Sequence, residues 1–162
     1  MVIYIVRHAW AVDADAPCVT DDASRPLTRE GRKRFARVVK KLVKRQWAPD
    51  CVISSPLVRC RETAEIIAAH APGKPEIVIR DELAPGSDLD GLLAFQRERN
   101  DESVAWVGHA PDVTHLCAAL MGDRSGTIRF AKGATAAIQF DGPPARGRGE
   151  LEWLVTAPML GC

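Results

Sequence analysis

The stretch Val2-Ile3-Tyr4-Ile5-Val6-Arg7-His8 decides the fold of this 162-residue chain. Its first five residues form a continuous apolar run rich in β-branched side chains, which is typical of a strand buried on both faces of a parallel sheet. The run stops at two basic side chains, so we expect Arg7 and His8 to lie at the carboxyl end of that strand. The sequence therefore places two polar groups at the edge where open α/β sheets bind ligands.

Helical and strand patterns alternate along the rest of the chain. Thr28 is a predicted N-cap for an amphipathic helix over residues 29–45, and Ser55 and Pro56 are predicted to begin a second helix that ends near residue 71. Further strands are expected at 51–54, 77–79, 104–107, 135–140 and 151–155, further helices at 89–99 and 111–121, and a loop at 13–26. This alternation predicts a single domain over residues 1–162 with a three-layer α/β/α fold and a mostly parallel sheet.

The composition excludes several classes of protein. Apolar residues make up 46% of the chain and charged residues 27%, as in a globular domain. The 22 Lys and Arg residues nearly balance the 21 Asp and Glu residues, so no net field attracts nucleic acid or an anionic membrane. The apolar run before Arg7 is too short for a signal peptide or a membrane span. We therefore expect neither nucleic acid nor a membrane as a partner.

Cysteine and histidine spacing gives no indication of a metal site or a disulfide framework. The five cysteines are Cys18, Cys51, Cys60, Cys117 and Cys162. They form no C-x-x-C pair, and an odd number cannot close completely into intramolecular disulfides, so reduced thiols and a cytoplasmic location are expected. No cysteine or histidine cluster has zinc spacing, and the glycine motifs that bind nucleotides are missing. Nothing in the sequence requires a metal or a cofactor.

Basic side chains follow three of the predicted strands. Arg7 and His8 follow the first strand, Arg59 comes shortly after the second, and His109 follows the strand at 104–107. Because ligands bind at the carboxyl ends of strands in an open α/β sheet, we expect these side chains to lie in one crevice. Two guanidinium groups and two imidazoles are costly to bring together unless an anion lies among them. The sequence therefore predicts a site for a phosphate-like anion.

The other two histidines fit this predicted site less well. His70 is expected near a helix end, where a partial positive charge is favourable. His115 lies six residues after His109, which is not the i, i+4 spacing of a helical metal pair. We expect structural roles for both.

The residues around the predicted site resemble the motifs of a known family. Ile5-Val6-Arg7-His8-Ala9 resembles the L-x-R-H-[GA] opening of the histidine phosphatase superfamily, in its phosphoglycerate-mutase-like branch. Three further stretches resemble its R-P-L-T-x-x-G, S-S-P-x-x-R-x-x-x-T-A and G-H-N-P motifs, in order: Arg25-Pro26-Leu27-Thr28-x-x-Gly31, Ser54-Ser55-Pro56-x-x-Arg59-x-x-x-Thr63-Ala64 and Val107-Gly108-His109-x-Pro111. The match covers nearly the whole chain. Trp10, where the family usually has a charged or polar residue, and Ala110, in place of Asn, depart from the pattern.

Within this superfamily the chain looks most like the SixA-type phosphohistidine phosphatases. The resemblance implies a covalent phosphohistidine on His8, phosphate held by Arg7, Arg59 and His109, and no metal. Side-chain chemistry agrees, because a neutral imidazole is a competent nucleophile near pH 7 and guanidinium groups match phosphoryl oxygens. Glu82 resembles the family's general acid, although a surface carboxylate in a turn is an equally good interpretation.

The expected substrate is a phosphohistidine on a protein, such as a histidine-containing carrier. The alternative is a small phosphate ester such as a sugar phosphate. The many Lys and Arg residues at 29–45 would also suit docking of nucleic acid or an acidic protein, although a solvated helix face is the simpler interpretation. A catalytically inactive phosphoprotein-binding domain is a third hypothesis, and the intact basic residues of the predicted site argue against it.

Overall fold

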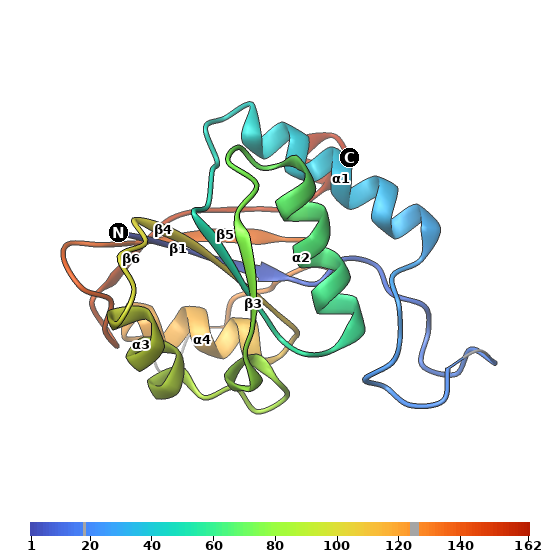
Figure 1. Ribbon diagram of the computed structural model, residues 1–162, viewed down its shortest axis with the longest axis horizontal. Helices are drawn as coiled ribbons and strands as arrows, with labels where there is room; N and C mark the ends of the chain where they lie inside the picture. Colours follow the sequence, from blue (N-terminus) through green and yellow to red (C-terminus); the bar gives the residue numbers. More distant parts are fainter. Residues whose placement is uncertain (18, 124–126) are drawn as a thin grey trace.

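Six strands form one sheet in the order β3-β2-β4-β1-β5-β6 (Figure 1). The computed structural model describes residues 1–17, 19–123 and 127–162. The strands are β1 (Val2–Arg7), β2 (Cys51–Ser54), β3 (Glu76–Ile79), β4 (Ser103–Gly108), β5 (Thr135–Phe140) and β6 (Gly149–Val155). The helices are α1 (Arg29–Val43), α2 (Val58–His70), α3 (Leu89–Arg97) and α4 (Asp112–Met121), with short 3-10 helices η1 (Asp81–Leu83) and η2 (Pro158–Leu160). Strands and helices thus alternate as the sequence pattern predicts.

The sheet is mixed. The four strands β3, β2, β4 and β1 are parallel to one another, whereas β5 pairs antiparallel with β1, and β6 pairs antiparallel with β5. The prediction of a mostly parallel sheet is therefore wrong. Parallel neighbours need a crossover of about a dozen residues or more. Residues 141–148, which join β5 to β6, are too few for a crossover, and the two strands form a hairpin instead.

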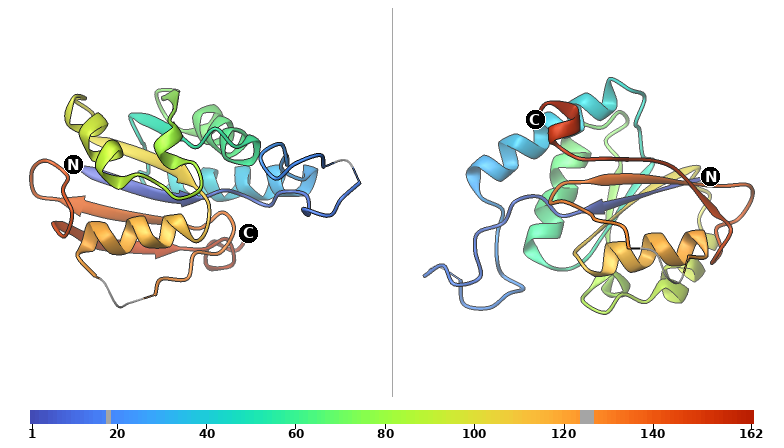
Figure 2. Two further views of the ribbon diagram at one scale, coloured as in Figure 1. Left: turned by 90° about the horizontal axis from the view of Figure 1, so that it is seen from below. Right: turned by 180° about the vertical axis from the view of Figure 1, so that it is seen from behind.

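Helices cover both faces of the sheet (Figure 2). α1 and α2 pack on one face against a cluster that includes Val6 and Val107, and α3 and α4 pack on the other face against Ile5 and Trp106. Successive residues of the central strands therefore enter two different cores. Burial on both faces explains why β1 is a continuous apolar run rather than an alternating one.

Helix α1 begins where the sequence predicts. The Thr28 side chain accepts a hydrogen bond from the Gly31 N–H at 2.9 Å and so caps the first turn. A Cβ atom at Gly31 would collide with the Trp10 carbonyl oxygen, so this close approach requires glycine. The first turn of α1 is thereby held against the loop that follows β1.

Helix α2 begins at Val58, two residues later than predicted, and its N-cap residue makes no side-chain cap. The Ser55 N–H donates to the Val107 carbonyl oxygen at 3.0 Å, which continues the pairing of β2 with β4. This extra pairing keeps Ser55 beside β4, and the helix starts only after a bend at Pro56 and Leu57.

No helix in the described part of the chain is long and apolar enough to cross a membrane. The cysteines described there are free thiols. Burial raises the pKa of Cys51 to about 11 and the pKa of Cys60 and of Cys117 to about 12, so these three are protonated at neutral pH. Cys18 lies outside the described residues.

Candidate active site

The polar ends of the three central strands meet at one edge of the sheet. β1, β4 and β2 are neighbours, and the His8 N–H donates to the Gly108 carbonyl oxygen at 2.9 Å, just beyond the last paired residues of β1 and β4. Arg59 reaches the same edge from the first turn of α2, close enough for its charge to act on His8. The structure thus brings together segments that are about a hundred residues apart, as parallel strand ends require.

His8 is almost fully buried, with 5% of its surface exposed. Its Nδ1 atom lies 2.7 Å from the backbone oxygen of Ala9, so Nδ1–H donates to that oxygen and the Nε2 lone pair remains free. Burial, reinforced by the positive charges of Arg59, Arg7 and His109, lowers the pKa of His8 to about 3. The imidazole is therefore neutral at pH 7, which is the form that attacks phosphorus.

Each of the two guanidinium groups keeps a buried donor without a partner. Arg7 donates from Nη1 to the Phe130 carbonyl oxygen at 2.7 Å. Arg59, which is 4% exposed, donates to the carbonyl oxygen of Asp22 at 2.6 Å and to its carboxylate at 2.9 Å. In the described part of the chain, the buried Nε atoms of both arginines have no acceptor. Buried donors are nearly always paired, so these two point to an acceptor that the protein itself does not supply.

Asp22 contacts Arg59 of the candidate site, and no sequence pattern indicated this contact. It comes from the predicted loop at 13–26, and its carboxylate pairs with Arg25 at 2.8 Å as well as with Arg59. Partial burial raises its pKa, but the two arginines outweigh that effect and the pKa lies below its usual value. A phosphoryl group that binds the terminal nitrogens of Arg59 must therefore compete with Asp22.

Thr63 joins the loop after β1 to helix α2. Its hydroxyl donates to the Arg59 carbonyl oxygen at 2.6 Å and accepts from the Ala9 N–H at 3.0 Å. Ala9, Arg59 and Thr63 are all buried. The hydroxyl therefore fixes the residue after His8 relative to the turn of α2 that carries Arg59, and this explains a threonine four residues after the arginine.

His109 is held at both ring nitrogens. Its Nε2 lies 3.1 Å from the Leu83 carbonyl oxygen and its Nδ1 lies 3.2 Å from a carboxylate oxygen of Asp112, which also accepts from the Gly86 N–H at 3.1 Å. Burial lowers the pKa of His109, and Asp112 opposes that shift only in part. Since both nitrogens already face oxygen atoms, a phosphoryl oxygen that contacts His109 must replace one of them.

Glu82 lies on η1, next to the Leu83 carbonyl that contacts His109. Its carboxylate is paired with both Nε and Nη2 of Arg80. The hydrogen bonds from Arg80 hold the pKa of Glu82 below its usual value. In this arrangement Glu82 is an ionised carboxylate, which is unfavourable for a proton donor.

The family model that describes the sequences of the histidine phosphatase superfamily (branch 1) matches residues 3–116 of this chain. The chain belongs to this superfamily. It is therefore a phosphatase, an enzyme of the hydrolase class.

Two relatives in sequence extend over most of this phosphatase. A protein of Picosynechococcus sp. (strain ATCC 27264 / PCC 7002 / PR-6) described as uncharacterised is 33% identical over 129 residues, which are 78% of this chain and 76% of that protein. The phosphohistidine phosphatase SixA of Escherichia coli (strain K12) is 28% identical over 159 residues, which are 94% of this chain and 92% of SixA.

Solved structures agree with this family. The protein histidine phosphatase SixA complexed with tungstate has a TM-score of 0.81 with this phosphatase at 26% identity, and the match covers 99% of both chains. The α-ribazole phosphatase from Shigella flexneri has a TM-score of 0.73 at 15% identity, with 97% of both chains covered, and this second likeness shows a shared fold alone.

Two further groups of residues are placed by the structure of this phosphatase. His70 is the last residue of α2 and His115 is exposed on α4. Across the described ranges, no three His, Cys, Asp or Glu side chains gather as a metal site would require.

Arg34 and Lys41 on α1 donate to the carbonyl oxygens of Cys162 and Leu160, at 3.0 and 2.5 Å. Part of the basic helix face is therefore used to hold the last residues of the chain.

Proposed function

We propose that this phosphatase hydrolyses phosphohistidine on a protein, with residues 1–162 acting as one domain. His8 Nε2 attacks phosphorus in line, so that its bond to phosphorus forms as the bond to the substrate imidazole breaks. The leaving imidazole takes a proton from water. A second water then attacks the phosphorus on His8 and passes a proton to the hydroxide that the first water left, while the bond between phosphorus and Nε2 breaks; this releases inorganic phosphate and restores the free imidazole.

The remaining basic residues act on the oxygens of the transferred group. Arg7 and Arg59 donate to the phosphoryl oxygens through the Nε–H groups that lack an acceptor, and Arg59 exchanges Asp22 for phosphate at its terminal nitrogens. His109 joins them by exchanging one of its two oxygen contacts. Donors already in place where negative charge develops are the most effective form of transition-state stabilisation.

One observation carries this proposal. A buried, neutral imidazole with a free Nε2 lies in the same site as two buried guanidinium donors without acceptors. A nucleophile alone would suit many reactions, and two arginines alone would suit an anion-binding protein. Together they suit transfer of a phosphoryl group to nitrogen.

The state of Glu82 supports a phosphorus–nitrogen bond as the bond that is cleaved. An alkyl phosphate ester needs a proton donor for its leaving oxygen, whereas a phosphohistidine imidazole departs readily once it is protonated. The carboxylate held by Arg80 is a poor donor. The resemblance to the phosphohistidine phosphatase SixA of E. coli, and to a SixA structure with the tetrahedral oxyanion tungstate, supports the same substrate class.

The test measures phosphate release from a peptide phosphorylated on histidine, from an aryl phosphate and from a panel of sugar phosphates. The peptide is expected to be the preferred substrate, and His8→Asn is expected to abolish turnover of all substrates. His115→Asn is the matched control, because that histidine is exposed on α4. Mass spectrometry after an alkaline quench is expected to find a phosphoryl group on the peptide that contains His8.

Two results would contradict the proposal. Full activity of His8→Asn would exclude the covalent intermediate. Turnover of sugar phosphates without turnover of the phosphohistidine peptide would assign the enzyme to small phosphate esters instead.

A further inference from the structure

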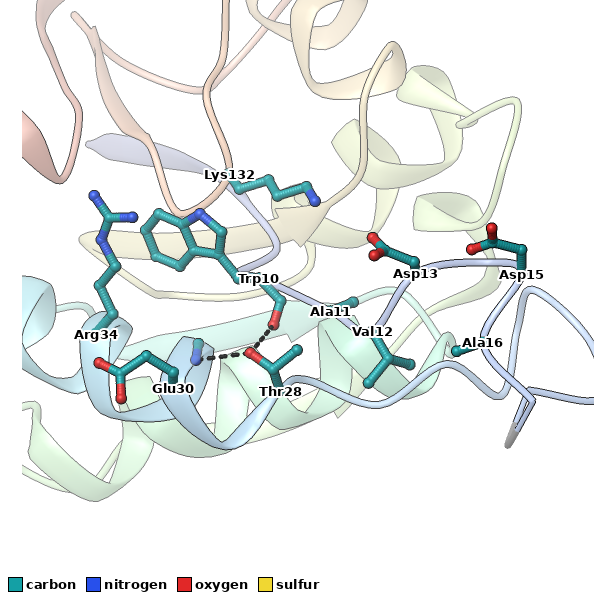
Figure 3. A pocket seen from close by; sticks show the side chains of 11 residues that line it. Trp10, Ala11, Val12, Asp13, Asp15, Ala16, Thr28, Glu30, Arg34 and Lys132 are labelled. Carbon is teal, nitrogen blue, oxygen red and sulfur yellow. Dashed lines mark hydrogen bonds between the residues drawn. The ribbon is translucent and has the colours of Figure 1, made fainter.

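A pocket of about 760 Å³ opens on the loop that follows β1 (Figure 3). We call it the Trp10 pocket, and its lining includes Trp10, Val12, Asp13, Asp15, Arg34 and Lys132. Trp10 comes two residues after His8 in the sequence. Lys132 precedes Gly133, whose N–H donates to the carbonyl oxygens of Arg7 and His8 at 3.2 and 3.0 Å. Two segments that line the pocket are therefore joined to the segment of Arg7 and His8, one along the chain and the other by backbone hydrogen bonds.

One wall of the Trp10 pocket is a fixed aromatic surface. The guanidinium of Arg34 lies 4.2 Å from the centre of the Trp10 ring and is itself held by the Cys162 carbonyl oxygen at 3.0 Å. Gly133 approaches the same ring so closely that a Cβ atom there would lie 3.1 Å from it. The Trp10 carbonyl oxygen accepts from the Thr28 N–H at 2.8 Å. These contacts hold the indole in place before a ligand arrives, which reduces the entropic cost of binding.

The other end of the Trp10 pocket carries exposed charges. In Figure 3, Asp13 and Asp15 lie at the end away from Arg34, and the Lys132 side chain extends past Trp10 toward Asp13. Within the described ranges, none of Asp13, Asp15 and Lys132 takes part in an ion pair. Two carboxylates face one ammonium group here, so this end favours cationic groups on a ligand.

We propose that the Trp10 pocket binds the polypeptide segment next to the phosphohistidine and selects segments that carry a basic side chain. This inference rests on the proposed function. The aliphatic stem of a lysine or arginine packs on an indole ring, while its charged end reaches a carboxylate. Trp10 with Asp13 and Asp15 offers that combination. Arg34, which already lies over the indole, shows that the ring accommodates a cation.

The size and charge of the pocket favour a polypeptide over a small phosphate ester. Pockets of about 300 to 1,000 Å³ enclose ligands of drug size. A sugar phosphate whose phosphate lies at His8 would leave most of this volume empty, and its hydroxyl or anionic groups would gain little from the two carboxylates. A polypeptide supplies both the bulk and the positive charge.

The test compares two synthetic peptides phosphorylated on one histidine, with lysines on either side in one and glutamates in the other. Phosphoramidate, which contains the phosphorus–nitrogen bond without a peptide, reports whether the wild-type enzyme is active. Asp13→Asn/Asp15→Asn removes the two carboxylates of the pocket, and Lys132→Gln removes its ammonium group. Asp141→Asn/Glu150→Gln is the matched control, because it removes two exposed carboxylates where the β5–β6 hairpin turns, at the sheet edge opposite His8.

The readout is the ratio of kcat/KM for the two peptides at low ionic strength. The wild-type enzyme is expected to prefer the lysine peptide about tenfold, as two exposed ion pairs would give. Asp13→Asn/Asp15→Asn is expected to lose most of that preference through KM, Lys132→Gln to increase it, and the control to retain it. Added salt is expected to reduce it.

Equal use of both peptides by the wild-type enzyme, or an undiminished preference in Asp13→Asn/Asp15→Asn, would overturn the inference. Hydrolysis of phosphoramidate in those cases would leave the proposed function intact. Failure to hydrolyse phosphoramidate and both peptides would overturn the proposed function, and the inference with it.

Discussion

The proposed phosphate site and the Trp10 pocket share the segment that follows β1, yet they are built in different ways. His8, Arg59 and His109 are buried at strand ends and a helix start, and neighbouring backbone atoms hold them by hydrogen bonds. Asp13 and Asp15 stand exposed on a loop. We call the buried phosphate site of His8, Arg59 and His109 the fixed part, and it is suited to chemistry, where small displacements of a donor cost much of the rate. We call the charged end of the Trp10 pocket the exposed part, and it is suited to discrimination between partners, which a few surface charges supply.

After loss of His8 itself, substitution of Arg59 is expected to have the largest effect, because it removes a fork of donors from the fixed part. Arg59→Lys keeps the charge but loses the paired geometry, and kcat/KM should fall by about 10²–10³. Steady-state kinetics on the phosphohistidine peptide measures this loss. Arg61→Lys, an exposed substitution on the same helix, should have wild-type kinetics. Equal effects of the two substitutions would remove Arg59 from the site.

Thr63→Val tests whether the hydroxyl between Ala9 and Arg59 positions the fixed part. The substitution keeps the shape but leaves the buried Ala9 N–H without an acceptor, which should lower the free energy of unfolding by about 1–3 kcal/mol. Urea unfolding measures this change, and kcat should fall with it. Thr63→Ser keeps the hydroxyl and should restore kcat. A wild-type kcat in Thr63→Val would show that the contact serves stability alone.

The low pKa of His8 makes the fixed part a source of acid sensitivity. Between the ordinary pKa of 6.5 and the folded value of about 3, the unfolded chain binds a proton at this histidine that the folded chain does not. Stability should therefore fall as the pH drops below 6.5, by up to about 1.4 kcal/mol per pH unit from this group. His8→Asn should show a shallower fall than the wild type when urea unfolding is measured at pH 7, 6 and 5. An unchanged slope would mean that His8 is protonated in the folded protein.

Asp22→Asn is expected to have the smallest effect, because it alters a contact between the loop and the fixed part. Its carboxylate competes with phosphate for Arg59. Removal of that charge should tighten inhibition by inorganic phosphate about threefold, within the range of exposed ion pairs. Asp21→Asn, next to it but without contact to Arg59, is the control. Weaker inhibition in Asp22→Asn would show that Asp22 is needed to orient Arg59.

The contrast between the two parts also decides what the sequence could predict. Arg7, His8, Arg59 and His109 could be grouped because apolar runs locate strands and because the ends of parallel strands meet. Strand direction is a different matter, since an apolar run looks the same in either direction. The strand at 135–140 was therefore predicted, but its antiparallel pairing with β1 and β6 was not. Asp22 could not be predicted, because its partner is 37 residues away and no periodicity links a loop to a helix. Asp112 could have been found, since it follows His109 at i, i+3 on a helix start.

The position of β1 in the sheet has a consequence for how the chain folds. This strand is near the start of the chain, but its two neighbours are Ser103–Gly108 and Thr135–Phe140. On a ribosome, β1 therefore stays unpaired until about a hundred further residues have been synthesised, and such long-range pairing is slow. His8 therefore reaches its place only after strands synthesised much later have paired with β1, and a nascent chain that stops before β5 lacks one of the two neighbours of β1.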